Sequence, residues 1–229
     1  MTRPRIIDLF CCAGGAAKGL HDAGFDVVGV DIEPQPEYPF EFIRGDALTV
    51  SLDDFDAAWA SPPCQRYSAA TRQSGKASDH PDLIPATRVR LERAGMPYII
   101  ENVLGAPLIR PIMLCGAMFD LGVVRHRLFE TSFHIAPPAH PKHKGSLVTG
   151  EYVTVAGNGG VPAWTMKERE RRGLPRHITG EYSIERWREA MGIDWMSRKT
   201  LTQAIPPAYA EWLGLLLRAE LLVQRRRAA

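Results

Sequence analysis

The sequence predicts an α/β protein with a Rossmann-like, doubly wound and mostly parallel sheet. Short apolar runs typical of buried strands recur through the first part of the chain, at 5–10, 25–31, 55–60 and 97–103. Helix-like stretches separate these runs, and a glycine-containing turn follows the first of them. Strands that alternate with helices in this way favour a doubly wound sheet with its strands mainly parallel.

Composition limits the class of protein. A chain of 229 residues suits one large domain, or one domain with a small second lobe. No apolar run approaches the roughly 20 residues that cross a bilayer, and the acidic Asp8 comes too early for a signal peptide. Four cysteines without a paired C-x-x-C pattern argue against a disulfide framework or a four-cysteine zinc site. We expect a reduced, cytoplasmic enzyme without membrane contact.

Changes in composition along the chain predict three segments. Residues 1–130 carry the alternating strands and helices of the main domain. Residues 131–182 are rich in proline, glycine and basic side chains, as in "PPAHPKHKG", and predict a small loop-rich inserted lobe. Residues 183–229 predict helices that return to the main domain, with Ser183 as an N-cap. The last helix should start after Pro206-Pro207, because apolar residues then recur at helical spacing.

The stretch "ASPPCQRYS" displays a thiol on a stiff loop. Pro62 and Pro63 fix their own backbone angles and favour an extended conformation in the residue before each of them. Cys64 follows them at the end of a predicted strand, where reactive side chains are commonly placed.

The stretch "DLFCCAGG" ends the first strand and begins a helix. Gly14 and Gly15 would allow close backbone approach, and Asp31 ends the next strand, where an acid can accept hydrogen bonds from ribose hydroxyls. The loop has neither a G-x-G-x-x-G nor a G-K-[ST] signature, so it predicts an adenosine-type cofactor without a phosphate cradle. A tight structural turn explains the two glycines equally well.

Further polar side chains are predicted at the same edge. Glu101, in "ENV", ends a central strand and could share a crevice with Cys64, although a strand-end glutamate is also a common buried ion-pair partner. Arg125 and Arg127, in "RHRLFE", would lie on one face of a strand because they are two positions apart. Facing inwards they require an anion or a polar ligand, whereas at an edge they would be solvated.

The order of these motifs resembles the cytosine-C5 DNA methyltransferase family. "DLFxxxGG", "PPCQxYS", "ENV", "RxRxF" and "AIPPxxAxxxG" cover the chain from Ile6 to about Gly214, with only the lobe unmatched. The short length is similar to compact phage or prophage members. The resemblance implies a class I S-adenosylmethionine-dependent fold and a DNA (cytosine-5-)-methyltransferase of a restriction-modification or phage system, in a bacterial or phage-infected bacterial cell.

The resemblance assigns catalytic roles. Cys64 is the thiolate that adds to C6 of cytosine, and Glu101 contacts N3 and the exocyclic amine. Asn102 fixes the surrounding loop, Arg127 contacts the base O2, and Arg125 is its neighbour in the strand. The target base is flipped out of the duplex, because a stacked base could not reach such a site. The products are 5-methylcytosine and S-adenosylhomocysteine.

The resemblance also assigns cofactor residues. Those expected to hold S-adenosylmethionine are Phe10, Gly14 and Gly15 in the first loop, Asp31 at the ribose, Ile32 on the adenine, Asp46 at the adenine amine, Pro63, and Gln203. The chain departs from the family pattern at Cys12, where a glycine is usual, at Val123 for a glutamine, and at Thr202-Gln203 for Gly-Asn. These departures bear on donor affinity and leave the cysteine chemistry intact.

The expected partner is double-stranded DNA, bound by a monomer or weak dimer. The lobe's basic residues would supply phosphate contacts and a recognition sequence of about two to four base pairs; they are Lys142, Lys144, Arg169, Arg171, Arg172 and Arg176. His134, His140 and His143 are interpreted as surface or phosphate-contacting residues, and no metal is expected, because no cysteine lies near them in the chain.

Three alternatives remain open on sequence grounds. The same chemistry could act on RNA or a free nucleotide, which the short lobe favours. A catalytically silent nucleic-acid-binding module is the second, although such a protein would be expected to have lost Cys64 or Glu101. A cysteine hydrolase is the third, and it lacks a histidine with an orienting partner, since His80 lies in a polar loop.

Overall fold

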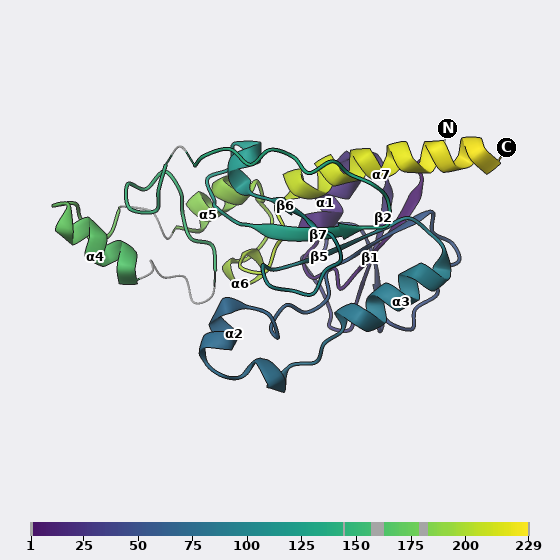
Figure 1. The fold of residues 1–229 in the computed structure, drawn as a ribbon, viewed down its shortest axis with the longest axis horizontal. Helices are drawn as coiled ribbons and strands as arrows, with labels where there is room; N and C mark the ends of the chain where they lie inside the picture. Colours follow the sequence, from purple (N-terminus) through teal and green to yellow (C-terminus); the bar gives the residue numbers. More distant parts are fainter. Residues whose placement is uncertain (1, 144, 157–162, 179–182, 229) are drawn as a thin grey trace.

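A computed structural model of the chain describes residues 2–143, 145–156, 163–178 and 183–228. Its centre is a seven-stranded sheet in the order β3-β2-β1-β4-β5-β7-β6 (Figure 1). The strands are β1 (Arg5–Leu9), β2 (Asp26–Asp31), β3 (Glu41–Arg44), β4 (Ala57–Ala60), β5 (Tyr98–Asn102), β6 (Ile112–Leu114) and β7 (Arg127–Thr131). The pairs from β3 to β5 are parallel, and β7 runs antiparallel to both β5 and β6. The predicted doubly wound, mostly parallel sheet is confirmed.

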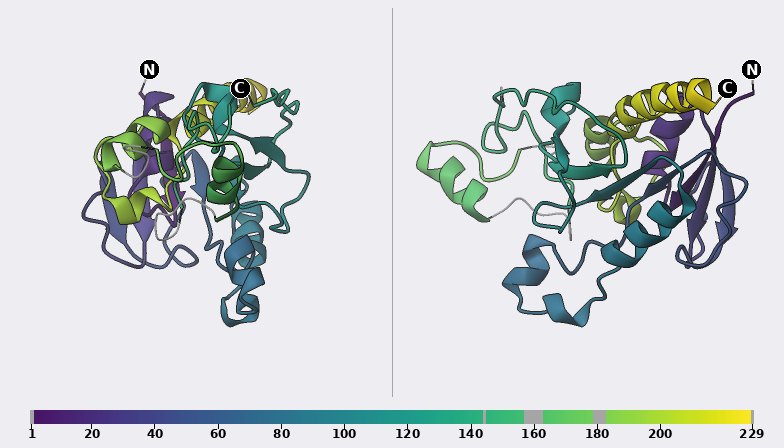
Figure 2. Two further views of the ribbon diagram at one scale, coloured as in Figure 1. Left: turned by 90° about the vertical axis from the view of Figure 1, so that its left-hand side faces the viewer. Right: turned by 45° about the vertical axis from the view of Figure 1, so that its right-hand side comes forward.

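Helices cover both faces of the sheet, which explains why its central strands are apolar throughout (Figures 1 and 2). Helices α1 (Gly15–Asp22) and α7 (Pro207–Ala228) lie on one face, where they pack against alternate residues such as Ile6, Trp59 and Ile99. Helix α3 (Ile84–Ala94) lies on the other face. Every residue of β4 and β5 is buried.

Close packing of α1 on α7 depends on Gly19. A methyl group added at Gly19 would lie 2.0 Å from the carbonyl oxygen of Pro207, so only glycine fits without a shift of backbone. The predicted apolar stripe of α7 faces this contact, with Tyr209, Leu213 and Leu217 fully buried. Helix α7 therefore belongs to the core of the main domain, as the sequence predicts.

The remaining helices lie at one end of the molecule, away from the chain termini (Figure 1). They are α2 (Ala69–Gln73), α4 (Ala163–Arg171), α5 (Ile184–Met191), α6 (Arg198–Leu201) and the short 3-10 turns Ala77–Asp79 and Gly116–Phe119. The predicted N-cap is confirmed, since the Ser183 side chain accepts a hydrogen bond from the Arg186 amide at 3.1 Å. Val153 and Val155 of the 131–182 segment pack with Trp187 of α5, which ties that segment to the C-terminal helices.

One strand assignment is wrong. Arg125 was expected in a strand with Arg127, but β7 begins at Arg127, and Arg125 lies in the connection before it. Strands β3 and β6 were not anticipated, because β3 reads Glu-Phe-Ile-Arg with mostly exposed side chains and β6 has three residues. Among the described helices none is both long and apolar enough to span a bilayer.

Candidate active site at the carboxyl edge of the sheet

The cysteine loop leaves β4 at the point where the strand order reverses, between β1 and β4. Ligand-binding crevices of open α/β sheets form outside the carboxyl ends of the strands at such a point. The Ser61 amide still pairs with the Leu9 carbonyl of β1 at 3.0 Å, after which Pro62 and Pro63 lead the chain away. The Cys64 carbonyl then accepts the amides of Tyr67 and Ser68, both at 2.9 Å, so the thiol sits at the start of a tight turn.

Asn102 holds this loop against β5. It is fully buried, its side-chain amide donates to the Pro62 carbonyl at 2.9 Å, and its carbonyl oxygen accepts from the Val103 amide at 2.9 Å. Both ends of the side chain are therefore satisfied by backbone. The structure gives Asn102 the geometry of a loop anchor.

Glu101 and Arg127 form a buried ion pair beside the cysteine loop. Their side chains come from the paired strands β5 and β7, and the Arg127 Nε lies 3.1 Å from a Glu101 oxygen. Burial raises the pKa of the Glu101 carboxyl, and this effect is opposed by Arg127, by Arg125 and by a hydrogen bond from Ser61. Glu101 is therefore a buried ion-pair partner, which is the alternative that the sequence left open for it. A carboxyl with a raised pKa is also able to carry a proton into contact with a base.

Cys64 lies close enough to this pair for their charges to act on it. Burial raises the pKa of the Cys64 thiol first, and the negative charge of Glu101 raises it further, whereas Arg127 and Arg125 lower it. In the structure the net direction is upward, because burial and the carboxylate outweigh the two guanidinium groups. This environment favours the thiol form of Cys64.

Arg125 is buried and its charge meets backbone carbonyls. It donates to Val155 at 2.6 Å and to Thr202 at 2.7 Å, while its own carbonyl accepts the Tyr209 hydroxyl at 2.8 Å. Its Nε has no hydrogen-bond partner among the described residues. Arg125 therefore joins the lobe segment to the chain before α7, close to the Glu101–Arg127 pair.

The first loop has an unusual backbone. Phe10 and Cys12 have φ angles of 59° and 46°, in the left-handed region that favours glycine. This explains why the family pattern has glycine where the chain has Cys12, and the structure accommodates the side chain there. The Cys12 amide donates to the Asp31 carboxylate at 3.0 Å, which joins the loop to the end of β2.

The two glycines of this loop meet protein atoms. A methyl group added at Gly15 would lie 2.4 Å from the carbonyl oxygen of Ile205, and one added at Gly14, whose φ is 81°, would lie 2.8 Å from Pro39. Packing of the turn therefore requires glycine at both positions. This geometry supports the structural explanation for the pair, and their contact with a donor stays a prediction.

The other predicted cofactor residues gather along the same edge. Asp31 and Ile32 follow β2, Asp46 follows β3, and Pro63 follows β4, so each lies at a carboxyl end of a parallel strand. Ile32 is 64% exposed, and a large apolar side chain left in solvent there is suited to pack against a flat ring. Gln203 is exposed and lies two residues before Ile205, which touches Gly15.

The structure adds two residues that the sequence argument missed. Ser61 accepts a hydrogen bond from the Trp59 indole at 2.9 Å and contacts Glu101, so it helps orient that carboxyl. Its position directly before Pro-Pro-Cys in the sequence could have indicated that Ser61 belongs to the site. Asp8 is buried in β1 beside Tyr38, and burial raises the pKa of its carboxyl. For Asp8, the signal in the sequence was an acidic residue within an apolar strand.

The basic side chains of the lobe differ in how far they are exposed and free to contact phosphates. Arg169 is 1% exposed and donates to the carbonyls of Leu147, Val148 and Arg176, so its predicted phosphate contact is wrong. Arg171 and Arg172 are exposed and both pair with Glu168 at 2.6 Å, and Arg176 pairs with Glu170 at 2.8 Å. Lys142 is exposed, and Lys144 lies outside the described residues.

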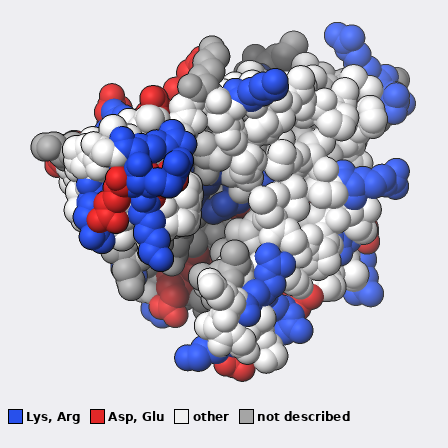
Figure 3. Space-filling view, turned by 60° about the vertical axis from the view of Figure 1, so that its left-hand side comes forward, with Lys and Arg blue, Asp and Glu red and all other residues white. Residues whose placement is uncertain are grey.

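The surface around the crevice carries basic groups on more than one side. Figure 3 shows lysine and arginine side chains gathered on the α4 end of the molecule and again on the lower part, where α2 lies, with a hollow between them. Arg225, Arg226 and Arg227 end α7 at the opposite end of the molecule from α4 (Figure 1). That triplet is remote from the hollow.

Comparisons with known proteins find similar sequences over part of the chain. The model of the family "C-5 cytosine-specific DNA methylase" matches residues 4–106, a range that includes Cys64 and Glu101. Type II methyltransferase M.XorII of Xanthomonas oryzae pv. oryzae is 32% identical over 124 residues, which are 46% of this chain and 29% of that protein. Type II methyltransferase M.AquIA of Picosynechococcus sp. is 28% identical over 124 residues, 44% of this chain and 49% of that protein. The chain therefore matches less than half the length of these curated relatives.

Solved structures match almost the whole chain at low identity. A DNA modification methyltransferase encoded within a prophage of E. coli has a TM-score of 0.58 at 14% identity and covers 96% of this chain, with 99% of its own length matched. The Entamoeba histolytica methyltransferase EhMeth has a TM-score of 0.59 at 12% identity, and the match covers 96% of this chain and 99% of that one. The Dnmt2 methyltransferase of S. pombe has a TM-score of 0.55 at 15% identity, and the match covers 95% of this chain and 99% of that one. At these identities the likeness shows the fold alone.

Proposed function

We propose that this chain, whose residues 4–106 match the model of the C-5 cytosine-specific DNA methylase family, methylates C5 of cytosine in DNA through a covalent adduct at Cys64. The observation that carries the proposal is the placement of the Cys64 loop beside the buried Glu101–Arg127 pair, at the carboxyl edge of the sheet. Together these side chains would supply a nucleophile, a proton-carrying acid and a cation at one place. This is the set of groups that an electron-poor pyrimidine ring requires before its C5 can react.

The chemistry follows from these three side chains. The Cys64 thiolate adds to C6 of the ring, and Glu101 supplies or shares a proton at N3, so the electron pair displaced from the 5,6 double bond is stabilised. The ion pair with Arg127 would keep the Glu101 carboxyl oriented, and we assign Arg127 to the O2 side of the base. After C5 has taken the methyl group, a base removes the C5 proton, the S–C6 bond breaks, and Cys64 leaves as a thiolate.

The residues along the edge of the sheet suit an adenosine-type methyl donor. S-adenosylmethionine supplies an electrophilic methyl group when it is bound. Asp31, a carboxylate at the end of β2, is positioned to accept ribose hydroxyls, and the exposed Ile32 next to it offers an apolar face to the adenine. We assign Asp46 to the adenine amine and Phe10, Gly14, Gly15, Pro63 and Gln203 to the walls of the same site.

We further propose that residues 131–182 form the target-recognition lobe. Arg125 ties this segment to the crevice through the Val155 carbonyl, and the hollow in Figure 3 separates its α4 end from the segment around α2. A duplex lying across the hollow would contact both sides with basic residues and present a flipped cytosine to Cys64. Residues 1–130 would then carry donor and catalysis, and residues 183–229 complete the main domain.

Replacement of the nucleophile tests the mechanism. Cys64→Ser should lose at least a thousandfold in turnover yet bind the donor normally, because a serine hydroxyl is almost never ionised at neutral pH. Duplex DNA containing 5-fluorocytosine should trap wild-type protein as a covalent complex, since fluorine cannot leave as a proton does. Peptide mass spectrometry should place the adduct on Cys64. Near wild-type turnover in Cys64→Ser would overturn the mechanism.

Labelled methyl transfer to four acceptors then tests the substrate. Duplex DNA, single-stranded DNA, structured RNA and dCMP would be offered in parallel to the wild-type protein, with Cys64→Ser as the blank. The proposal expects duplex DNA to be the preferred acceptor. Preference for RNA or dCMP would retain the cysteine chemistry and replace the DNA assignment.

A further inference from the structure

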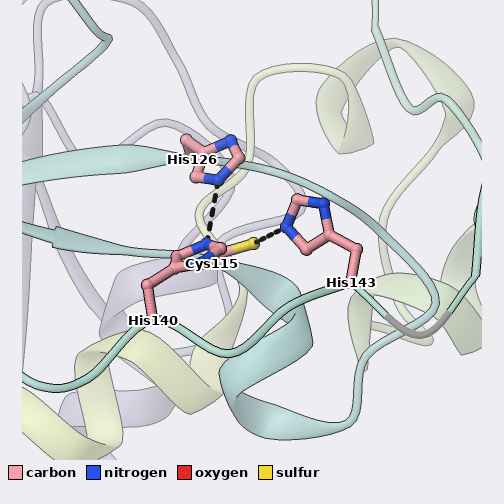
Figure 4. A group of neighbouring side chains, drawn as sticks. All are labelled: Cys115, His126, His140 and His143. Carbon is pink, nitrogen blue, oxygen red and sulfur yellow. Dashed lines mark hydrogen bonds between the residues drawn. The ribbon is translucent and has the colours of Figure 1, made fainter.

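Four potential metal ligands meet at the edge of the sheet where the lobe begins. The Sγ of Cys115 and one ring nitrogen each of His126, His140 and His143 all lie within 4.8 Å of one another. His126 and His140 approach to 3.1 Å between their Nε2 atoms, and Cys115 Sγ lies 3.4 Å from His143 Nε2. Figure 4 shows the four side chains converging from separate segments onto one point.

We propose that these four side chains bind a zinc ion. In a tetrahedral site with Zn–S near 2.3 Å and Zn–N near 2.0–2.1 Å, neighbouring ligand atoms lie about 3.3–3.6 Å apart. The separations of 3.1 Å between His126 and His140 and of 3.4 Å between Cys115 and His143 already lie close to that range. Because His140 and His143 are exposed, rotation of their side chains is free to bring the remaining atoms in.

The donor set selects among metals. One thiolate and three imidazoles suit Zn²⁺, whereas Mg²⁺ and Ca²⁺ require oxygen ligands, and no carboxylate belongs to the cluster. Binding converts the Cys115 thiol to a thiolate and releases its proton to solvent. Four protein ligands fill a tetrahedral zinc ion, so the site would be structural and hold no reactive water.

The ligands come from three segments that differ in position along the fold. Cys115 directly follows β6, His126 directly precedes β7, and His140 and His143 belong to the loop that begins the lobe. A shared ion would therefore bind the start of the lobe to the β6–β7 edge. His126 stands between Arg125 and Arg127, so the ion would also fix the backbone from which both arginines reach the crevice.

The structure changes the sequence interpretation of these histidines. His134 was grouped with His140 and His143, and a metal was discounted because no cysteine lay near them in the chain. The fold brings Cys115 and His126 to the pair, and His134 lies outside the cluster. His134, which is exposed and precedes His140 by six positions, therefore provides a matched control.

Metal content tests the proposal. Protein purified after growth with zinc and passed through a weak chelator should carry about one zinc ion per chain by plasma mass spectrometry. His134→Ala should match the wild type, and the double variant His140→Ala/His143→Ala should lose at least nine-tenths of the metal while keeping its circular dichroism spectrum. Wild-type protein without zinc, or equal zinc in the double variant, would overturn the site.

Cobalt gives a second readout that needs only folded wild-type protein. Co²⁺ added to chelator-stripped protein should produce the intense visible bands of tetrahedral cobalt and a near-ultraviolet band from thiolate-to-cobalt charge transfer. Cys115→Ser should lose the charge-transfer band. The weak spectrum of six-coordinate cobalt in the wild type would refute the ligand set. Neither measurement depends on methyl transfer, so failure here leaves the proposed function standing.

Discussion

The thiol of Cys64 and the carboxyl of Glu101 share one buried environment, and this sets the resting state of the candidate nucleophile. Burial raises the pKa of both groups, and the charge on Glu101 raises the pKa of Cys64 further. Transfer of the Glu101 proton to N3 would leave the carboxylate charged, which favours the thiol of Cys64, so this transfer cannot itself activate the thiol. The same environment keeps Cys64 mainly in the less reactive thiol form, which limits side reactions.

Removal of the Glu101 charge should therefore activate the thiol. In Glu101→Gln the pKa of Cys64 should fall, so at a fixed pH below that pKa more thiolate is present and iodoacetamide alkylates Cys64 several times faster. Arg127→Gln should act in the opposite direction, because Arg127 lowers this pKa. Peptide mass spectrometry over a pH series separates Cys64 from Cys12, whose pKa is raised to about 12. Identical alkylation profiles in the two variants would contradict the coupling.

Several residues of the site could be predicted because they end strands. Cys64, Glu101 and Asp31 close apolar runs, and the carboxyl ends of parallel strands share an edge. The environment of Arg125 could not be predicted in this way. Its partners are the backbone carbonyls of Val155 and Thr202, which are remote in the chain and leave no pattern in the side chains. The same holds for the Cys115 and histidine cluster, which exists only once the fold brings three segments together.

At the scale of helices and strands, burial decided what the sequence could predict. Strands β1, β4 and β5 are buried and read as apolar runs, and α7 presents an apolar stripe, so each was predicted within a few residues. Strand β3 lies at the edge with mostly exposed side chains, and its pattern carries no such signal. The exposed side chains of an edge strand carry little information about pairing.

The contact between α1 and α7 yields a stability prediction. Gly19→Ala raises intrinsic helix propensity by about 1 kcal/mol, yet its methyl group would meet the Pro207 carbonyl oxygen at 2.0 Å. Overpacking of this kind costs about 1–3 kcal/mol, so we expect net destabilisation in urea unfolding. Gly45→Ala is the control, because its methyl group would have only Ile43 nearby, at 3.9 Å. A stabilised Gly19→Ala variant would show that the helices are not packed as described.

Across the whole molecule, charge is distributed unevenly in a chain whose formal net charge is only +2. Basic groups gather at the α4 end beside the hollow, and a second group ends α7 at the opposite end (Figures 1 and 3). Ion pairs with Glu168 and Glu170 offset part of the charge on α4 and just after it. The sequence showed the excess of basic residues, but not that Arg169 is buried or that the two groups lie far apart.

The position of these charges predicts how salt should affect DNA binding. Each neutralised phosphate of a duplex contributes about 0.9 to the slope of log affinity against log salt concentration. Arg171→Ala/Arg172→Ala should weaken binding to all sequences and lower that slope by about one to two, the smaller value applying if Glu168 retains one of the two arginines. Arg226→Ala/Arg227→Ala removes the same charge at the far end of α7 and should leave the slope unchanged. Fluorescence anisotropy with a labelled duplex at several salt concentrations measures both variants. Equal losses of slope would mean that net charge alone governs binding, and would remove the lobe from the proposed interface.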